Sequence, residues 1–228
     1  MAKVIIFIGG VSALPNSGRP TGMFKQQVSG PLELGPEGFI GDQQADRRVH
    51  GGPEKAVHLY PASHYAKLAA CFPEAAAQLI PGSLGENLSS ADLDESSVRI
   101  GDIYRLGNAR LQVCQPRNPC WKIDDRFDAD GMAAYIAEQS LTGWYWRVVQ
   151  PGLLQTDDAL ELEQSAGTAP PSLQPWRSGK PIAQPSANWS NSPPLLALPA
   201  TGNVKSSTAQ TGCANSQGKR YRPNRCFT

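Results

Sequence analysis

Cysteine pairs spaced as C-x-x-C are absent from this chain of 228 residues, although it holds five cysteines. Zinc ribbons and disulfide frameworks need paired cysteines, so neither is predicted. No hydrophobic stretch is long enough to cross a bilayer. The apolar run at residues 4–8 is interrupted by Gly9 and Gly10 and is shorter than the core of a signal peptide. These absences predict a protein of the reducing cytoplasm without a membrane partner.

Acidic residues are also absent from residues 165–228, which hold seven Lys and Arg, whereas residues 1–164 hold 14 Lys and Arg against 20 Asp and Glu. Nine prolines mixed with Ser, Asn, Thr and Gln in the second segment cannot pattern a hydrophobic core. We therefore expect a folded acidic domain over residues 1–164, with no nucleic-acid partner, and a disordered basic tail over residues 165–228. A shifted reading frame would produce so abrupt a change, and resequencing the 3′ half of the gene would test that hypothesis.

Short apolar runs separated by turn residues fill most of residues 1–164, at the intervals typical of a β-barrel. Strands are predicted over residues 3–8, 21–28, 31–34, 38–40, 57–60, 98–106, 109–113, 143–149 and 160–162. An alanine-rich segment over residues 62–79 has a helical pattern that Pro73 must divide or kink, and a second helix is predicted over residues 129–139. The predicted fold class is mainly β with a few short helices.

Residues 113–122 are the strongest candidate for chemistry. Two prolines restrict the backbone ahead of Cys120, so this loop is stiff. If a helix begins here, Asn118 is its N-cap and Cys120 falls in the first turn, where free N–H groups favour a thiolate. Arg117 adds a permanent positive charge nearby. Cys120 is then a metal ligand or a nucleophile, and the alternative is a buried structural thiol.

Two further segments hold candidate binding residues. His50 is followed by Gly51 and Gly52, and paired glycines let backbone N–H groups converge on an anion such as a phosphate. A simple tight turn is the competing interpretation. Asn87 carries an amide that can pair with both a donor and an acceptor of a ring system, or can instead close its own turn.

Several other polar residues are better interpreted as structural. Cys114 lies in a strand-like alternation, His58 in an apolar run and His64 near a helix start. The histidines do not have the local spacing of a zinc site with Cys120. For Glu86, a general acid and a hydrogen bond at a strand end both stay open.

Four motifs in these segments together resemble the MOSC family, named for the C-terminal domain of molybdenum cofactor sulfurase. They are Gly-Asp-Gln-Gln-Ala-Asp at residues 41–46, Val-His-Gly-Gly-Pro-Glu-Lys-Ala at 49–56, Gly-Glu-Asn-Leu-Ser at 85–89 and Gln-Pro-Arg-Asn-Pro-Cys at 115–120. Their order and approximate spacing are those of the family's small stand-alone bacterial branch, and the resemblance runs from about residue 3 to about residue 163.

The resemblance implies a MOSC-type β-barrel that holds a molybdenum cofactor (molybdopterin), with Cys120 as the catalytic residue and the protein ligand to the metal. It implies cofactor contacts from Lys25, His50, Gly51, Lys55, Asn87, Arg117 and Asn118. Members of this branch are associated with reducing N-hydroxylated compounds, such as N-hydroxylated purines or amidoximes, with electrons from a separate reductase. The chain has no flavin, haem or iron–sulfur motif, so that reductase must bring its own electron donor.

Two alternatives to reduction stay open from the sequence. One is transfer of persulfide sulfur through Cys120, although the chain lacks the domain with the pyridoxal-phosphate lysine that generates the persulfide in full sulfurases. Pyridoxal phosphate is thus only a family-level association. The other alternative is a non-enzymatic cofactor carrier. Members of the branch commonly continue into a helical C-terminal domain that residues 165–228 do not resemble, which leaves the oligomeric state open.

Overall fold

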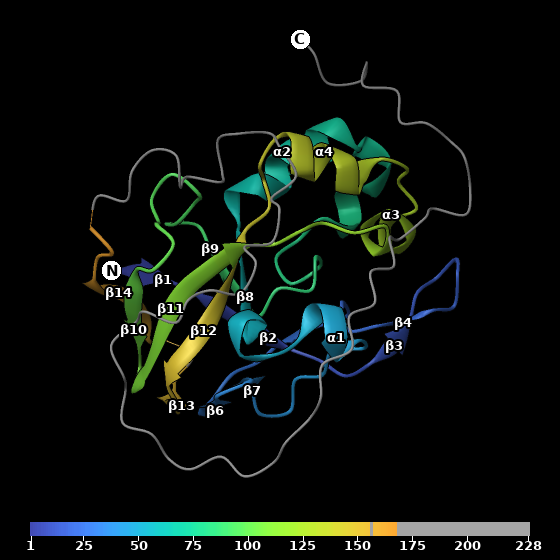
Figure 1. The fold of residues 1–228 in the computed structure, drawn as a ribbon. Helices are drawn as coiled ribbons and strands as arrows, with labels where there is room; N and C mark the ends of the chain where they lie inside the picture. The colour runs from blue at the N-terminus through green and yellow to red at the C-terminus, as the bar shows by residue number, and fades with distance from the viewer. Residues whose placement is uncertain (156, 168–228) are drawn as a thin grey trace, which may run out of the picture. The chain divides into compact units, whose positions relative to one another are not determined.

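The computed structural model describes residues 1–155 and 157–167, so that most of the predicted tail, residues 168–228, lies outside the described residues. The described chain is mainly β with short helices, which confirms the predicted class (Figure 1). Its main sheet contains nine strands, and seven of its eight neighbouring pairs are antiparallel. The exception is the pair β8 and β9, which is parallel and has helices in its connection.

In sheet order the nine strands are β1 (Ala2–Lys3), β14 (Ala159–Gln164), β10 (Ile103–Leu106), β11 (Ala109–Pro116), β12 (Trp144–Gln150), β8 (Val57–Pro61), β9 (Leu88–Ser90), β2 (Ile5–Ile8) and β5 (Gln26–Gln27). A second sheet holds β13 (Gly152–Leu154), β6 (Leu32–Gly35) and β7 (Gly38–Phe39), and a third holds β3 (Ser12–Ala13) and β4 (Pro20–Thr21). The helices are α1 (Arg47–His50), α2 (Ser63–Cys71), α3 (Lys122–Phe127), α4 (Met132–Glu138) and the 3-10 helices η1 (Pro53–Lys55) and η2 (Pro73–Gln78).

The N-terminal stretch changes partners at Val4. Ala2 and Lys3 pair with β14, whereas Ile5 and Ile6 pair with β9. The first eight residues therefore contact two strands that are far apart in the sheet order. No closed ring of strand pairs is found in the described part of the chain, so the predicted barrel is not established.

Other local predictions can be compared with the structure element by element. The hairpin of β10 and β11 forms around Gly107, and the alanine-rich segment divides at Pro73 into α2 and η2, as predicted. The strand predicted over residues 21–28 is wrong, because only the two-residue strands β4 and β5 form there. Between them the chain packs closely: a Cβ at Gly22 would lie 2.5 Å from the carbonyl oxygen of Gln43.

The hydrophobic core has two clusters. One is built from sheet residues such as Leu59, Leu111 and Trp146, and the other joins α2, α3 and α4 to the sheet through residues such as Leu68 and Ile136. Figure 1 shows these three helices gathered beside one end of the long strands. The ends of β8 and β11 and the start of β12 thus lie beside these helices, because β12 runs antiparallel to both of its neighbours. None of the described helices combines the length and apolarity that a membrane span requires.

Candidate functional site

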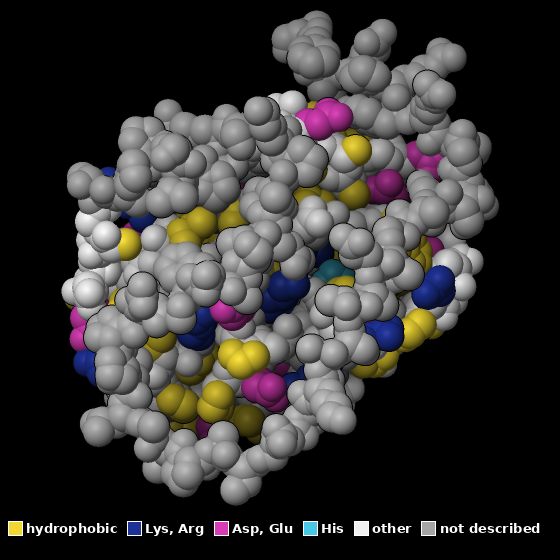
Figure 2. Space-filling model, in the orientation of Figure 1, with side chains coloured by type: hydrophobic (Ala, Val, Ile, Leu, Met, Phe, Trp, Pro, Cys, Tyr) yellow, Lys and Arg dark blue, Asp and Glu magenta, His cyan; other side chains and the backbone are white. Residues whose placement is uncertain are grey.

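A pocket with an empty volume of about 590 Å³, counted together with its open mouth, brings most of the candidate residues together. Six of them line it: Lys25, His50, Lys55, Asn87, Arg117 and Cys120. Gly51 and Asn118 are not among the lining residues. Figure 2 shows Lys and Arg side chains close to a His side chain on one face of the molecule.

Cys120 reaches the pocket from a loop and not from a helix. The helix expected to begin beside Asn118 begins instead at Lys122, with Trp121 at the N-cap position. The backbone N–H of Ile123 donates to the carbonyl oxygen of Cys120 at 3.0 Å, so Cys120 closes the turn that precedes the helix. The interpretation of Asn118 as an N-cap is therefore wrong, and the position of Cys120 depends on the stiff proline-containing loop.

The two described cysteines without a disulfide differ in their surroundings. The sulfur of Cys120, which is half-buried, lies 4.0 Å from Nε2 of His50. Cys114 lies in β11 and does not line the pocket, and burial raises the pKa of its thiol to about 11. A thiol with that pKa is unreactive at neutral pH, which supports the structural interpretation of Cys114.

His50 is the last residue of α1. Burial is the largest cause that lowers its pKa, to about 4, and the positive charges of Arg117, Lys122 and Lys55 lower it further. His50 is therefore neutral at pH 7 and adds no positive charge to the pocket. Beside Cys120 it offers an uncharged imidazole nitrogen.

The two glycines after His50 do not form the paired anion cradle predicted from the sequence. Gly51 has an extended backbone with φ −137°, and Gly52 alone has a positive φ, 92°. A Cβ at Gly51 would lie 3.0 Å from backbone atoms of Arg47. Gly51 thus lets the chain turn back closely over α1. Because Gly51 does not line the pocket, its expected contact with a cofactor stays a prediction.

Arg117 is the most informative residue of the pocket. The residue is only 6% exposed, and its Nη1 atom has no hydrogen-bond partner. No carboxylate in the described part of the chain forms an ion pair with it. Its guanidinium hydrogen-bonds Tyr145, whose pKa is raised by burial in spite of this contact. Because a buried charge without a counter-ion is costly, the arrangement favours an anionic ligand.

Lys25 is buried too, but its charge is compensated. Its ammonium group forms an ion pair with Asp42, and the two side chains are 4% and 2% exposed. Burial lowers the pKa of Lys25, and the Asp42 carboxylate opposes that shift. The same carboxylate accepts hydrogen bonds from the backbone of Gly9 at 2.9 Å and from the Asn87 amide at 2.9 Å. Asp42 is therefore the anchor of this wall of the pocket.

The Asn87 amide is fully used by the protein. Its nitrogen donates to Asp42 and to the carbonyl of Phe7 at 3.2 Å, and its oxygen accepts from the backbone of His58 at 3.2 Å. Such an amide has little capacity left for a ring system. In this structure Asn87 positions its neighbours, and its direct contact with a cofactor stays a prediction.

The remaining cations of the pocket bond carbonyl groups. Lys55 donates to the carbonyl of Val49 and Lys122 to that of Pro20, each at 2.8 Å. Among the described lining residues only Asp42 carries a carboxylate, and Lys25 already neutralises it. The pocket is therefore positively charged although residues 1–164 are acidic overall.

Four ionisable lining residues were not proposed as site residues from the sequence: Asp42, His58, Lys122 and Tyr145. Asp42 lies inside the first quoted motif, so its place was visible there. Alternation along β12 could have separated Tyr145 from the core residues Trp144 and Trp146, since successive strand side chains point to opposite faces. His58 offered no such signal, because it lies in an apolar strand.

Two residues have the structural contacts that the sequence favoured. Glu86 does not line the pocket, and its Oε1 atom accepts from the Tyr65 hydroxyl at 2.5 Å and from the Gly82 backbone at 2.6 Å. Burial raises the pKa of Glu86. His64 contacts Glu95 outside the pocket. These contacts favour a hydrogen-bonding role for Glu86 and a structural role for His64.

Comparisons with known proteins show the family to which the chain belongs. Residues 46–161 match the MOSC domain. The chain is 42% identical over 159 residues to Protein YiiM of Escherichia coli K12, with 70% of each chain covered. It is 36% identical over 141 residues to a protein named Reductase from Gibberella moniliformis, with 61% of this chain and 25% of the relative covered. The crystal structure of YiiM from Escherichia coli matches with a TM-score of 0.60 and 36% identity, covering 72% of this chain and 69% of that one. The chain therefore belongs to the MOSC domain family, as its sequence motifs predicted.

Proposed function

We propose that this chain binds a molybdenum cofactor in the Cys120 pocket and, with it, reduces N-hydroxylated compounds using electrons from a separate reductase. The observation that carries the proposal is the buried, unpaired guanidinium of Arg117 in the same pocket as the half-buried sulfur of Cys120. A relative named Reductase supports the redox class. The association of MOSC domains with molybdenum cofactors supports the ligand.

The residues of the pocket fit such a group on chemical grounds. Arg117, Lys55 and Lys122 would bind its phosphate, because they provide cationic donors without a carboxylate partner among the described residues. Cys120 would provide a thiolate, which is a soft ligand suited to a heavy metal. When bound, a molybdenum cofactor supplies two-electron redox chemistry.

Two neighbours of Cys120 would control hydrogen bonding in the pocket. His50 is neutral at pH 7 because its pKa is about 4, so it orients groups near the sulfur without adding charge. Burial raises the pKa of Tyr145, so its phenol keeps its proton at pH 7. That phenol can donate a hydrogen bond to an oxygen atom of a bound molecule.

The proposed reaction converts R–NH–OH, two electrons and two protons into R–NH₂ and water. The N–O bond breaks, one proton goes to the oxygen, which already carries a hydrogen and leaves as water, and the other proton goes to the nitrogen of the amine. The electrons come from the separate reductase, which is oxidised in the reaction. Tyr145 and Arg117 both line the pocket and would stabilise the oxygen that departs.

Cofactor content tests the binding part of the proposal. The chain would be produced in a host that makes molybdenum cofactor, and its molybdenum and pterin fluorescence would be measured. We expect both in the wild-type chain and a loss of at least about tenfold in Cys120→Ser, because a thiolate ligand is removed. Cys114→Ser is the matched control, since Cys114 lies outside the pocket, and it should retain both. Cofactor content unaffected by Cys120→Ser would refute Cys120 as the ligand.

Turnover separates the enzyme from the alternatives. An N-hydroxylated purine or an amidoxime would be offered to the loaded chain with a chemical reductant. Formation of the amine supports reduction. Cofactor without turnover supports a carrier, and labelled sulfur found on Cys120 supports persulfide transfer.

A further inference from the structure

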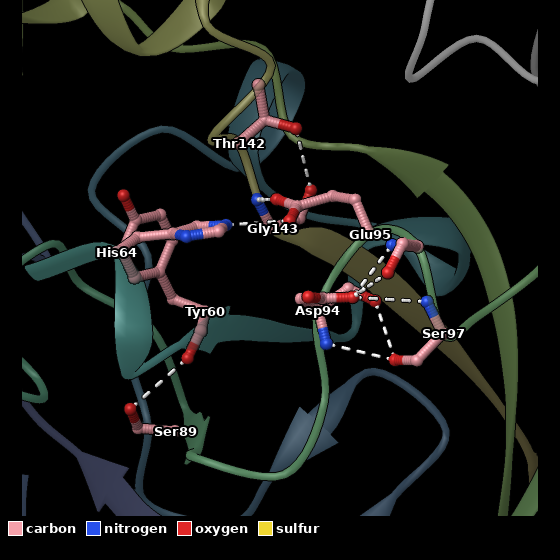
Figure 3. A network of polar contacts seen from close by, with 9 residues as sticks. Tyr60, His64, Ser89, Asp94, Glu95, Ser97, Thr142 and Gly143 are labelled. Atoms are coloured by element: carbon pink, nitrogen blue, oxygen red, sulfur yellow. Dashed lines mark hydrogen bonds and ion pairs between the residues drawn. The ribbon is translucent and has the colours of Figure 1, made fainter. Parts of the chain in front are cut away.

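Glu95 and His64 form a buried acid–histidine pair (Figure 3). Glu95 belongs to the loop between β9 and β10, and His64 to the first turn of α2. Oε2 of Glu95 lies 2.6 Å from Nε2 of His64, and the two side chains are 10% and 4% exposed. Neither residue lines the pocket. Nothing in the proposed reaction uses this pair, so it needs a separate explanation.

The second carboxylate oxygen of Glu95 holds the peptide of Gly143. The Gly143 N–H donates to Oε1 at 2.8 Å, and Figure 3 shows this contact beside the one with His64. Gly143 has a φ of 61°, and a Cβ there would lie 2.3 Å from the carbonyl oxygen of Leu59. Only glycine fits this position, because the backbone is left-handed and packs directly against β8.

The carbonyl of Gly143 in turn holds Arg117. It accepts the backbone N–H of Arg117 at 3.1 Å and the hydroxyl of Thr142 at 3.0 Å. The Thr142 backbone also hydrogen-bonds the ring of His58, another lining residue. Residues 142 and 143 therefore connect the Glu95 carboxylate to the backbone of Arg117 and to the ring of His58.

We propose that Glu95 is a positioning residue for Arg117, acting through the backbone N–H and carbonyl groups of Gly143. This inference rests on the proposed function, in which Arg117 binds the anionic group of the ligand. The Glu95 carboxylate fixes the N–H side of Gly143, His64 fixes the carboxylate, and the fixed carbonyl of Gly143 sets the place where the Arg117 backbone leaves β11. Charge-assisted hydrogen bonds are short and directional, so they suit this task.

The neighbouring Asp94 provides a matched control. Its carboxylate caps its own turn, accepting the backbone N–H groups of Ser96 at 2.9 Å and Ser97 at 3.2 Å. The Ser96 hydroxyl, which donates to the same carboxylate at 2.6 Å, is the largest cause that lowers the pKa of Asp94, and the two backbone contacts lower it further. Asp94 thus stabilises the same loop without contacting Gly143. Its replacement shows how a less stable loop alone affects phosphate binding.

The test measures inorganic phosphate binding by NMR titration and hydrogen exchange of the Gly143 and Arg117 amides. In Glu95→Ala we expect phosphate affinity to fall about tenfold and both amides to exchange faster, because the Gly143 N–H loses its charged acceptor. Glu95→Gln keeps an acceptor oxygen and should retain affinity within about threefold. Asp94→Ala should bind phosphate like the wild-type chain while unfolding at lower denaturant.

Each result decides between positioning and simple stability. Wild-type affinity and amide protection in Glu95→Ala would overturn the inference, as would an equal loss of affinity in Asp94→Ala. If Glu95→Ala does not fold, exchange in the wild-type chain still decides: the Gly143 and Arg117 amides should open together, and independent opening would overturn the link. A wild-type chain that binds neither phosphate nor cofactor would instead count against the proposed function, while the amide measurements would still test Glu95.

Discussion

The two buried cations of the pocket stand in opposite situations. Lys25 faces Asp42, whose carboxylate also bonds the backbone of Gly9 and the amide of Asn87, so the donors and acceptors on that wall are mutually satisfied. Arg117 is equally withdrawn from solvent but has an unbonded Nη1 and no carboxylate partner in the described residues. On the wall that contains Lys25, the polar groups are satisfied without a ligand. The wall that contains Arg117 is incomplete, because that guanidinium keeps an unbonded nitrogen.

This difference separates residues that maintain the structure of the pocket from residues that are available to bind a ligand. A buried pair that is fully hydrogen-bonded maintains geometry, whereas an unpaired buried charge keeps a cost that a ligand can offset. Lys25 and Asn87 were both expected to contact the cofactor. Their hydrogen bonds and ion pair show that they maintain the geometry of the pocket. The unbonded Nη1 of Arg117 instead indicates a ligand-binding residue.

The largest expected effect is on the completed wall. Asp42→Asn would leave Lys25 buried without its counter-charge and should lower the free energy of unfolding by about 3–5 kcal/mol. Urea denaturation measures this loss. In the double variant Asp42→Asn with Lys25→Met, the unpaired charge is gone, so we expect recovery of part of the loss. A single variant as stable as the wild-type chain would show that the Lys25–Asp42 pair does not hold this wall.

A smaller effect is expected from pH. His50 has a pKa of about 4 in the folded chain against the ordinary histidine value of 6.5, so between these values the unfolded state binds more protons. This contribution to stability is complete above pH 6.5 and is lost as the pH falls to about 4. The pKa difference corresponds to about 3 kcal/mol. His58 adds to the loss in the same direction, because burial holds its pKa well below the usual range.

Denaturation at pH 7 and at pH 4.5 would measure the pH effect, and His50→Gln isolates the share of His50. The variant should lose less stability on acidification than the wild-type chain. Equal losses would mean that His50 is not held neutral by burial and by the cations of the incomplete wall.

Several elements of the fold around the pocket could be predicted from the sequence, whereas the contrast between Lys25 and Arg117 depends on tertiary contacts. The proline loop, the β10–β11 hairpin and the break at Pro73 follow from local backbone restrictions, so they were predicted correctly. The helix start beside Asn118 was wrong because a turn through the Cys120 carbonyl delays it. Local sequence also could not show that Asp42 lies beside Lys25, since that contact joins segments 17 residues apart.

The same limit explains why Glu95 was not singled out. Its partners, His64 and Gly143, lie 31 and 48 residues away in the chain, and an acidic residue in a polar loop is ordinarily solvated. A resemblance to a family places motifs in order, but it does not say which of their polar groups satisfy one another. That distinction required the contacts of each atom.

The smallest effect on stability should have the opposite sign. Arg117→Met removes an uncompensated buried charge and retains an apolar side chain of similar length, so the free chain should gain about 1–2 kcal/mol of unfolding free energy. Phosphate affinity should fall at least about tenfold, because the charged donor is lost. Urea denaturation and NMR titration on one sample would measure both.

The same change at Arg126 provides the control. Arg126 bonds the side chain of Gln78 at 2.9 Å and stacks 4.3 Å from the ring of Phe24, and it does not line the pocket. Arg126→Met should leave phosphate affinity unchanged and should lower stability, because packing and a hydrogen bond are lost. If Arg117→Met also destabilised the chain, or kept its phosphate affinity, then the guanidinium would belong to the wall that is complete by itself, and the contrast with Lys25 would disappear.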